Sequence, residues 1–129
     1  MEQMFYENSS KYGFDETVSK LSELIAEGGW RVIQLLDLQE IMKKNGKDVL
    51  PVKVIELCNP GYAYRLLSDN SLRLYSSMLP CRISVYEQAD GSTYVSRINA
   101  EMLSSQIGGV AQKVMTDAFK DAESFMKKV

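Results

Sequence analysis

The feature that most constrains the fold is a pair of β-type segments around a tight-turn signal. Residues 82–87 and 93–98 are rich in β-branched and aromatic side chains, and the dipeptide Asp90-Gly91 lies between them. Such a dipeptide between two alternating segments is a strong signal for a β-hairpin, because both residues tolerate positive φ angles. The chain is therefore expected to contain antiparallel sheet, against which its helices must pack.

Three more strands are predicted from composition. Residues 30–36 (WRVIQLL) and 52–58 (VKVIELC) are dominated by large apolar and β-branched side chains, which favour strands. Residues 3–9 are assigned to a first strand near the beginning of the chain. Together with the hairpin, these segments predict five strands.

Helices are predicted between these strands from residues that cap helix ends. Asp15, Asp37, Asn59 and Asn99 each have a side chain that can accept a hydrogen bond from the first turn of a helix. Apolar residues recur behind each cap at helical spacing. The predicted helices cover residues 15–28, 37–45, 59–68 and 99–129, the last with a break at residues 108–109.

The resulting element order is βαβαβαββα. It predicts an α+β fold, a two-layer sandwich in which the helices pack on one face of a mostly antiparallel sheet. The sequence has no internal repeat or linker, so residues 1–129 are expected to form one domain. The order of the strands in the sheet is not indicated.

Composition excludes several functions. The chain has no histidine, which removes His-based acid–base catalysis, serine-type triads and ordinary His-containing zinc sites. The net charge is −2, and no basic cluster larger than a Lys-Lys pair such as Lys127-Lys128 occurs, so no nucleic-acid partner is expected. No apolar segment approaches the roughly 20 residues that span a bilayer, so no membrane partner is expected. The first residues do not resemble a signal peptide, and a cytoplasmic location with reduced cysteines is predicted.

Four motifs resemble one known family. They are residues 11–18 (KYGFDETV), 56–60 (ELCNP), 79–87 (LPCRISVYE) and 93–97 (TYVSR). In this order and over nearly the whole chain, they are similar to the family labelled domain of unknown function 302. The resemblance implies a compact α+β fold and often a homodimer. It implies no catalytic residues and no cofactor, so none is assigned.

The hairpin predicts one polar surface. A two-residue turn at Asp90-Gly91 would pair Ser84 with Arg97 and place both on one sheet face with Arg82. Two guanidinium groups with a serine between them could bind a carboxylate or phosphate. The same face could instead contact the same face of a second copy in a dimer, and we rank this alternative first. It could also remain a solvated surface with weak ion pairs, in which Glu56 neutralises one of the arginines.

Asn59 is a further candidate for ligand binding. It precedes Pro60 at the start of a predicted helix, where free backbone N–H groups favour anions. The alternative is an ordinary helix cap, and the segment lacks the glycines of a phosphate-binding loop.

The two cysteines are a second set of candidates. Cys58 ends one predicted strand and Cys81 begins another, and both are expected to fill the core by default. Alternatively they meet as a redox-active thiol pair, or bind a soft metal such as Cu(I) together with Met78. Their separation is unlike a Cys-x-x-Cys motif.

These observations favour a cytoplasmic homodimeric domain that is not an enzyme and that binds a small ligand, anions included, or a protein partner. The alternative is a thiol-dependent redox or soft-metal-handling protein that uses Cys58 and Cys81.

Overall fold

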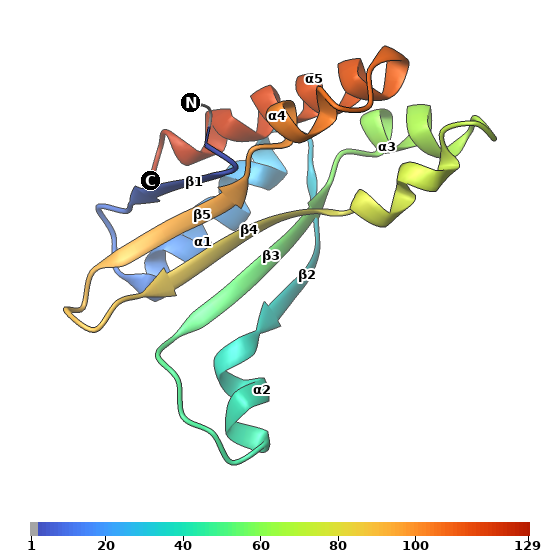
Figure 1. Ribbon diagram of the computed structural model, residues 1–129. Coiled ribbons are helices and arrows are strands. Elements are labelled where there is room, and N and C mark those ends of the chain that lie inside the picture. The colour runs from blue at the N-terminus through green and yellow to red at the C-terminus, as the bar shows by residue number, and fades with distance from the viewer. Residues whose placement is uncertain (1–2) are drawn as a thin grey trace.

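A computed structural model describes residues 3–129 (Figure 1). It contains five strands and five α-helices, with one additional 3-10 helix, η1. In chain order the elements are β1 (Phe5–Ser9), α1 (Phe14–Glu27), β2 (Arg31–Asp37), α2 (Leu38–Lys44), β3 (Val52–Cys58), α3 (Pro60–Leu67), η1 (Arg73–Met78), β4 (Cys81–Glu87), β5 (Thr93–Ile98), α4 (Ala100–Ser104) and α5 (Gly109–Met126).

The strands form one antiparallel sheet in the order β1-β5-β4-β3-β2. The predicted α+β class and element order are thereby confirmed. The break that the two glycines predicted in the last helical region is also present, since Gly108 separates α4 from α5 with a φ of 74°. No helix within residues 3–129 is long and apolar enough to cross a membrane.

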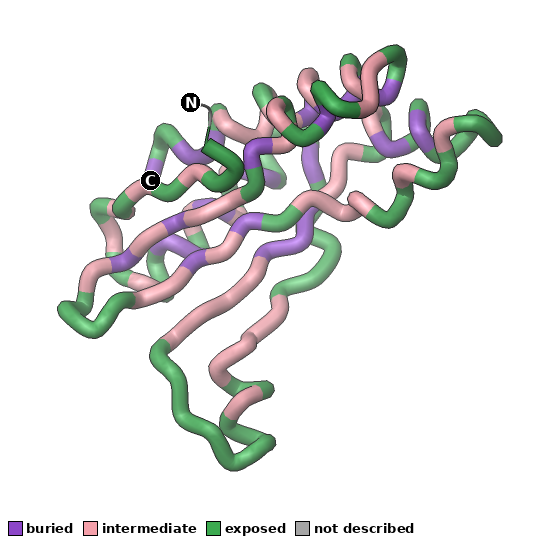
Figure 2. Tube along the Cα trace, viewed as in Figure 1, coloured by how far each residue is buried: buried purple, intermediate pink, exposed green. Residues whose placement is uncertain are grey.

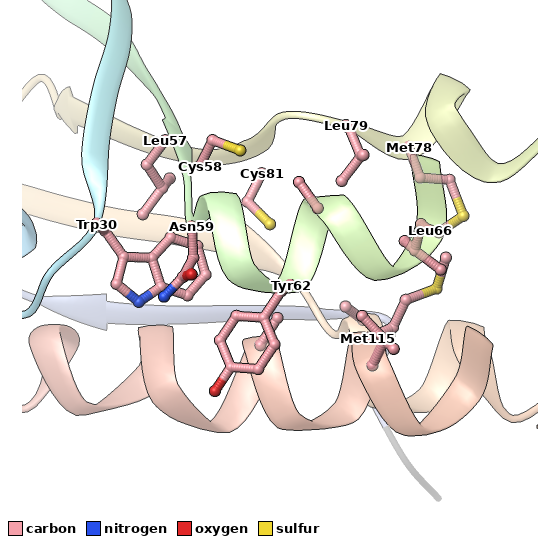
Figure 3. Close-up of a pocket in the computed structure, with 14 residues that line it drawn as sticks. Trp30, Leu57, Cys58, Asn59, Tyr62, Leu66, Met78, Leu79, Cys81 and Met115 are labelled. Atoms are coloured by element: carbon pink, nitrogen blue, oxygen red, sulfur yellow. The ribbon is translucent and has the colours of Figure 1, made fainter. Parts of the chain in front are cut away.

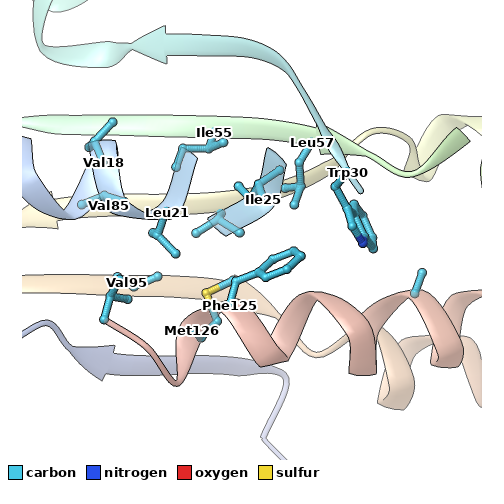
Figure 4. Close-up of a cluster of buried hydrophobic side chains, with 13 residues drawn as sticks. Val18, Leu21, Ile25, Trp30, Ile55, Leu57, Val85, Val95, Phe125 and Met126 are labelled. Atoms are coloured by element: carbon cyan, nitrogen blue, oxygen red, sulfur yellow. The ribbon is translucent and has the colours of Figure 1, made fainter. Parts of the chain in front are cut away.

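The core lies between the sheet and the two long helices α1 and α5 (Figure 4). Alternate residues of β3, β4 and β5 point to this side, while α1 contributes the apolar stripe that its helical spacing predicted. The buried side chains at the centre of this cluster are Leu21, Ile25, Ile55, Leu57, Ile83, Val85 and Val95. A second, smaller cluster joins α3 to α5 through Leu66, Ala111, Val114 and Met115.

The hairpin register differs by one residue from the prediction. Val85 pairs with Val95, whereas a two-residue turn would have placed Tyr86 opposite Val95. The turn is longer because Gly91, with a φ of 86°, adds a left-handed residue after a tight turn, and the Gln88 N–H bonds to the Ser92 carbonyl at 2.8 Å. Since side chains alternate along a strand, this slip moves each β5 side chain to the opposite sheet face.

Residues 31–54, which we call the arm, comprise the β2 edge of the sheet and the α2 segment that extends beyond it (Figure 1). The arm consists of β2, α2 and the first part of β3, and Figure 2 shows that most of it is exposed or half-buried. None of the seven residues of α2 is buried. Six large aliphatic side chains of the arm are exposed: Val32, Ile33, Leu35, Ile41, Val49 and Leu50.

Candidate functional site

A pocket of about 70 Å³ lies where the two hydrophobic clusters meet (Figure 3). The end of β3 and the start of β4 form one wall, and α3 and α5 form the others. Its lining is almost entirely apolar and sulfur-containing. The lining residues are Trp30, Leu57, Cys58, Asn59, Tyr62, Ala63, Leu66, Met78, Leu79, Cys81, Ala100, Val114, Met115 and Ala118.

Asn59 connects the β3 wall to the α3 wall. Its side-chain Oδ1 accepts a hydrogen bond from the Gly61 N–H at 3.0 Å, and Pro60 occupies the first helical position. The predicted capping role of Asn59 is thus confirmed. The amide Nδ2 is the hydrogen-bond donor of this side chain, and the cap leaves it free to donate to a ligand.

Aromatic side chains hold one end of the pocket in place. The Trp30 indole N–H donates to Asp121 Oδ2 on α5 at 2.7 Å, and the ring packs against Tyr62 with 6.0 Å between centroids. Phe125 also meets the Trp30 ring, in an edge-to-face arrangement. Sequence reasoning placed Trp30 only at the start of a strand and missed this role. The available signal was that Trp30 is the only tryptophan in the chain.

Cys58 and Cys81 are both among the residues that line the pocket (Figure 3). Cys81 pairs with Leu57 across β3 and β4, so the side chain of Cys58, the next residue of β3, points to the opposite face of the sheet from that of Cys81. Both cysteines are free thiols, and neither is fully buried. Cys81 packs against the main core cluster, as its default assignment predicted.

Burial controls the chemistry of these thiols. It raises the pKa of Cys81 to about 11, and the nearby Cys58 adds to this shift. Burial also raises the pKa of Cys58, which is the more open of the two. Both groups are therefore neutral thiols at pH 7, whereas thiol–disulfide exchange requires a thiolate.

Met78 also lines the pocket, but at its other end. Figure 3 shows its thioether near Leu66 and Met115, with Leu79 between it and the cysteines. The three soft donors that the sequence singled out thus share one cavity without forming one compact cluster. Within residues 3–129, no group of three or more His, Cys, Asp or Glu side chains is placed to hold a metal ion.

The predicted pairing of Ser84 with Arg97, which would place Arg97 on the same sheet face as Arg82, is wrong. Because the hairpin register is shifted by one residue, Ser84 pairs with Ser96, and Arg97 lies on the helix-covered face. There it makes two hydrogen bonds to the Glu123 carboxylate of α5, at 2.8 and 2.7 Å, and one to Asn8.

Arg82 remains on the open face of the sheet. Its Nε lies 3.2 Å from Glu56 Oε2 on β3, the neutralising contact that the solvated-face alternative included. With each arginine paired to a different carboxylate on a different face, Arg82, Ser84 and Arg97 do not form one anion clamp. Of the four predicted ligand-binding residues, Asn59 alone lines the pocket.

Five antiparallel strands with helices on one face and an apolar pocket at one end define a small two-layer α+β domain. The chain belongs to the family described as domain of unknown function DUF302, whose model matches residues 6–129. It is similar to the crystal structure of an uncharacterized conserved protein DUF302 from Bacillus stearothermophilus, with a TM-score of 0.87, 25% sequence identity and 98% of each chain covered. No curated protein matches the chain.

Proposed function

We propose that this domain binds the apolar end of a small ligand in the pocket between its two core clusters. The observation that carries the proposal is the cavity itself. Protein interiors are close-packed, so an apolar hollow of this size forgoes packing contacts that the fold would otherwise make. A binding role gives a physical reason for keeping it.

The size and lining of the pocket limit the ligand. Sites for whole metabolites usually exceed about 300 Å³, so this cavity fits a short alkyl or thioether group rather than an entire molecule. The amide Nδ2 of Asn59 supports a hydrogen-bond acceptor on the ligand near the end of β3. A fully anionic ligand is less well supported, because Arg82 and Arg97 both lie outside the lining and are paired with carboxylates.

Trp30 allows a direct test of this binding. As the only tryptophan and a wall of the pocket, it reports occupancy through its fluorescence. We expect a series of straight-chain alcohols to change this signal, with affinity rising about fourfold per added methylene until the cavity is full, which corresponds to about 0.8 kcal/mol per CH₂. An affinity that does not depend on chain length would contradict the proposal.

A filled pocket provides the control. Ala118→Leu adds a side chain where α5 lines the cavity, and it should abolish the alcohol response while leaving the protein folded. The matched variant Ala26→Leu, at an exposed position of α1, should bind as the unsubstituted protein does. Equal binding by both variants would place the alcohols elsewhere.

We further propose that the domain acts as a homodimer in the cytoplasm and that the arm takes part in the contact. Six large aliphatic side chains are exposed within this one segment, and exposed apolar surface of this kind often marks a contact with another protein. A two-fold dimer would cover this surface with the same surface of a second copy, which is self-complementary because both sides are aliphatic. The open sheet face with the Arg82–Glu56 pair continues from the arm through β3.

Paired charge substitutions test this assembly. Ile33→Glu, at a 57% exposed position of the arm, should convert the dimer to a monomer, because a carboxylate would have to be desolvated in the contact. Leu74→Glu, at a 67% exposed position of η1, should leave the dimer intact. Sedimentation velocity distinguishes the two states, and a monomeric unsubstituted protein would exclude the homodimer.

A further inference from the structure

A second pocket, of about 400 Å³, lies where the end of α5 meets β1 and β5 (Figure 1). Its lining residues, all within the described chain, are different from those of the apolar pocket. Its volume falls within the range of about 300–1,000 Å³ that is typical of sites for small molecules. This end of the molecule therefore offers space for a whole small ligand.

The charged side chains that line the second pocket are mostly basic. Lys11, Arg97 and Lys127 carry positive charges, and Glu123 is the one carboxylate side chain among the lining residues of the described chain. The net charge of the whole chain is −2, so this basic region lies on an acidic protein. Because a hollow lined by one sign of charge concentrates ions of the opposite sign, the lining favours an anion.

The hydrogen-bond acceptors of the lining already bind protein donors. Both oxygens of the Glu123 carboxylate accept from Arg97, at 2.8 and 2.7 Å, and Asn8 Oδ1 accepts from the same guanidinium. The backbone carbonyl of Val129 accepts from the Lys11 N–H at 3.0 Å. The pocket is therefore poorly suited to a ligand that mainly donates hydrogen bonds.

The lining has donors in excess. Among residues 3–129, neither Lys11 nor Lys127 forms an ion pair with a carboxylate. The Lys11 ammonium lies 5.4 Å from the centroid of the Tyr12 ring, and its flexible stem allows it to turn toward a ligand. A guanidinium has five N–H groups, and Arg97 uses three of them in the bonds above, so two remain. Excess donors and occupied acceptors are complementary to an anion rich in oxygen atoms.

We propose that this second pocket binds a small polyanion, a molecule with two or more phosphate or carboxylate groups. Lys11 and Lys127 bind its charged groups, and the Arg97–Glu123 pair, which joins β5 to α5, holds the wall between them in place. Two ammonium groups favour a multivalent ligand over a monovalent ion, because a single ion pair at an exposed position contributes little. The site is separate from the apolar pocket and does not depend on the ligand proposed there.

Isothermal titration calorimetry tests the site with inorganic pyrophosphate and with citrate, in buffer free of divalent metal ions. We expect one polyanion per chain, with an affinity that falls when NaCl is raised to about 0.2 M, since salt screens exposed charges. Acetate at the same ionic strength should not bind. Binding by pyrophosphate alone would assign the site to phosphates, and binding by citrate alone would assign it to carboxylic acids. If neither binds, or if acetate binds equally well, the proposal is wrong.

Two neighbouring lysines provide a matched pair of variants. Lys127→Glu places a carboxylate in the lining and should weaken binding more than about tenfold. Lys128→Glu changes the net charge by the same amount outside the lining and should stay within about threefold of the unsubstituted protein. Lys11→Ala should weaken binding by about tenfold. Equal losses in Lys127→Glu and Lys128→Glu would show a response to overall charge rather than a site.

The variants also separate this site from apolar binding. Ala118→Leu should lose the alcohol response of Trp30 and keep the polyanion, whereas Lys127→Glu should lose the polyanion and keep the alcohol response. Loss of the polyanion in folded Ala118→Leu would place it in the apolar pocket and overturn the assignment.

Discussion

At the scale of single residues, Arg97 illustrates how this fold accommodates a charge on its covered face. The Arg97 side chain is 12% exposed and the Glu123 side chain 21%, and their charged groups are joined by paired hydrogen bonds. The same guanidinium packs over the ring of Tyr6, 5.7 Å from its centroid. The network links β1, β5 and α5, so its loss should affect the whole domain.

We predict that Arg97→Ala lowers the free energy of unfolding by about 3 kcal/mol, because it leaves a largely desolvated carboxylate without its partner. Urea denaturation measures this change. The control is Lys113→Ala, which removes an exposed i,i+4 pair with Asp117 and should cost less than about 0.5 kcal/mol. Similar losses in both variants would mean that the Arg97 pair is not effectively buried.

The thiols give a second prediction at this scale. Because burial raises the pKa of Cys81 from 9.0 to about 11, native protein should alkylate slowly at this residue below pH 9, with a rate that increases toward pH 11. Cys58 should react faster, since it is less enclosed. Mass spectrometry after iodoacetamide treatment measures both, with urea-unfolded protein as the reference. Rapid native alkylation below pH 8 would instead support the thiol-redox alternative.

The same shift affects stability with a definite sign. A thiol whose pKa is higher in the folded than in the unfolded protein contributes to stability. This contribution is fully present below the pKa of the unfolded state and is lost as the pH rises through the pKa of the folded state. For Cys81 the loss is expected between pH 9 and about 11.

How well the sequence predicts the role of a residue depends on how close along the chain its interaction partners lie. Asn59 was recognised as a cap because its hydrogen bond closes within two residues. Trp30 was missed because its partner Asp121 lies far along the chain on α5, whereas Arg97 was misplaced because the hairpin turn is one residue longer than predicted. No local pattern indicates which helix will cover a given strand residue.

At the scale of elements, the hairpin shows how one residue changes a surface. Composition identified both strands and the turn residues, but Asp-Gly fits a two-residue turn and a three-residue turn with a left-handed glycine equally well. The choice between them determined which face Arg97 occupies. The strand order likewise depends on contacts between distant segments, such as β1 with β5.

The contact between α1 and α5 yields a prediction about packing. A Cβ added at Gly28 would lie 2.6 Å from Cε1 and 2.8 Å from Cζ of the buried Phe125 ring. We expect Gly28→Ala to destabilise the protein by about 1–3 kcal/mol through this overlap, since its φ of −79° is accessible to alanine.

A double-mutant cycle tests the cause. Phe125→Leu removes the overlapping ring atoms, so adding Gly28→Ala to that variant should cost much less than it does alone. Additive losses in thermal or urea unfolding would show that the ring is not responsible.

At the scale of the whole molecule, the distribution of apolar surface is uneven. The main body has a continuous core between the sheet and the helices α1 and α5, whereas the arm carries six exposed aliphatic side chains and a helix with no buried residue. A seven-residue helix in water is not stable on its own, because helix nucleation is unfavourable without tertiary packing. The arm should therefore gain its order from the second copy proposed above.

This dependence predicts that protection of the arm changes with protein concentration. In dilute solution, amide hydrogens of residues 38–50 should exchange quickly, and they should slow as concentration increases, because dimerisation stabilises only the associated state. Amides of α5 should show the same protection throughout, since their packing is within one chain. Ile33→Glu should hold the arm in the fast-exchanging state at every concentration. If instead the arm exchanges at the same slow rate in the variant and across the dilution series, its order comes from its own chain and the exposed aliphatic surface is not a dimer contact.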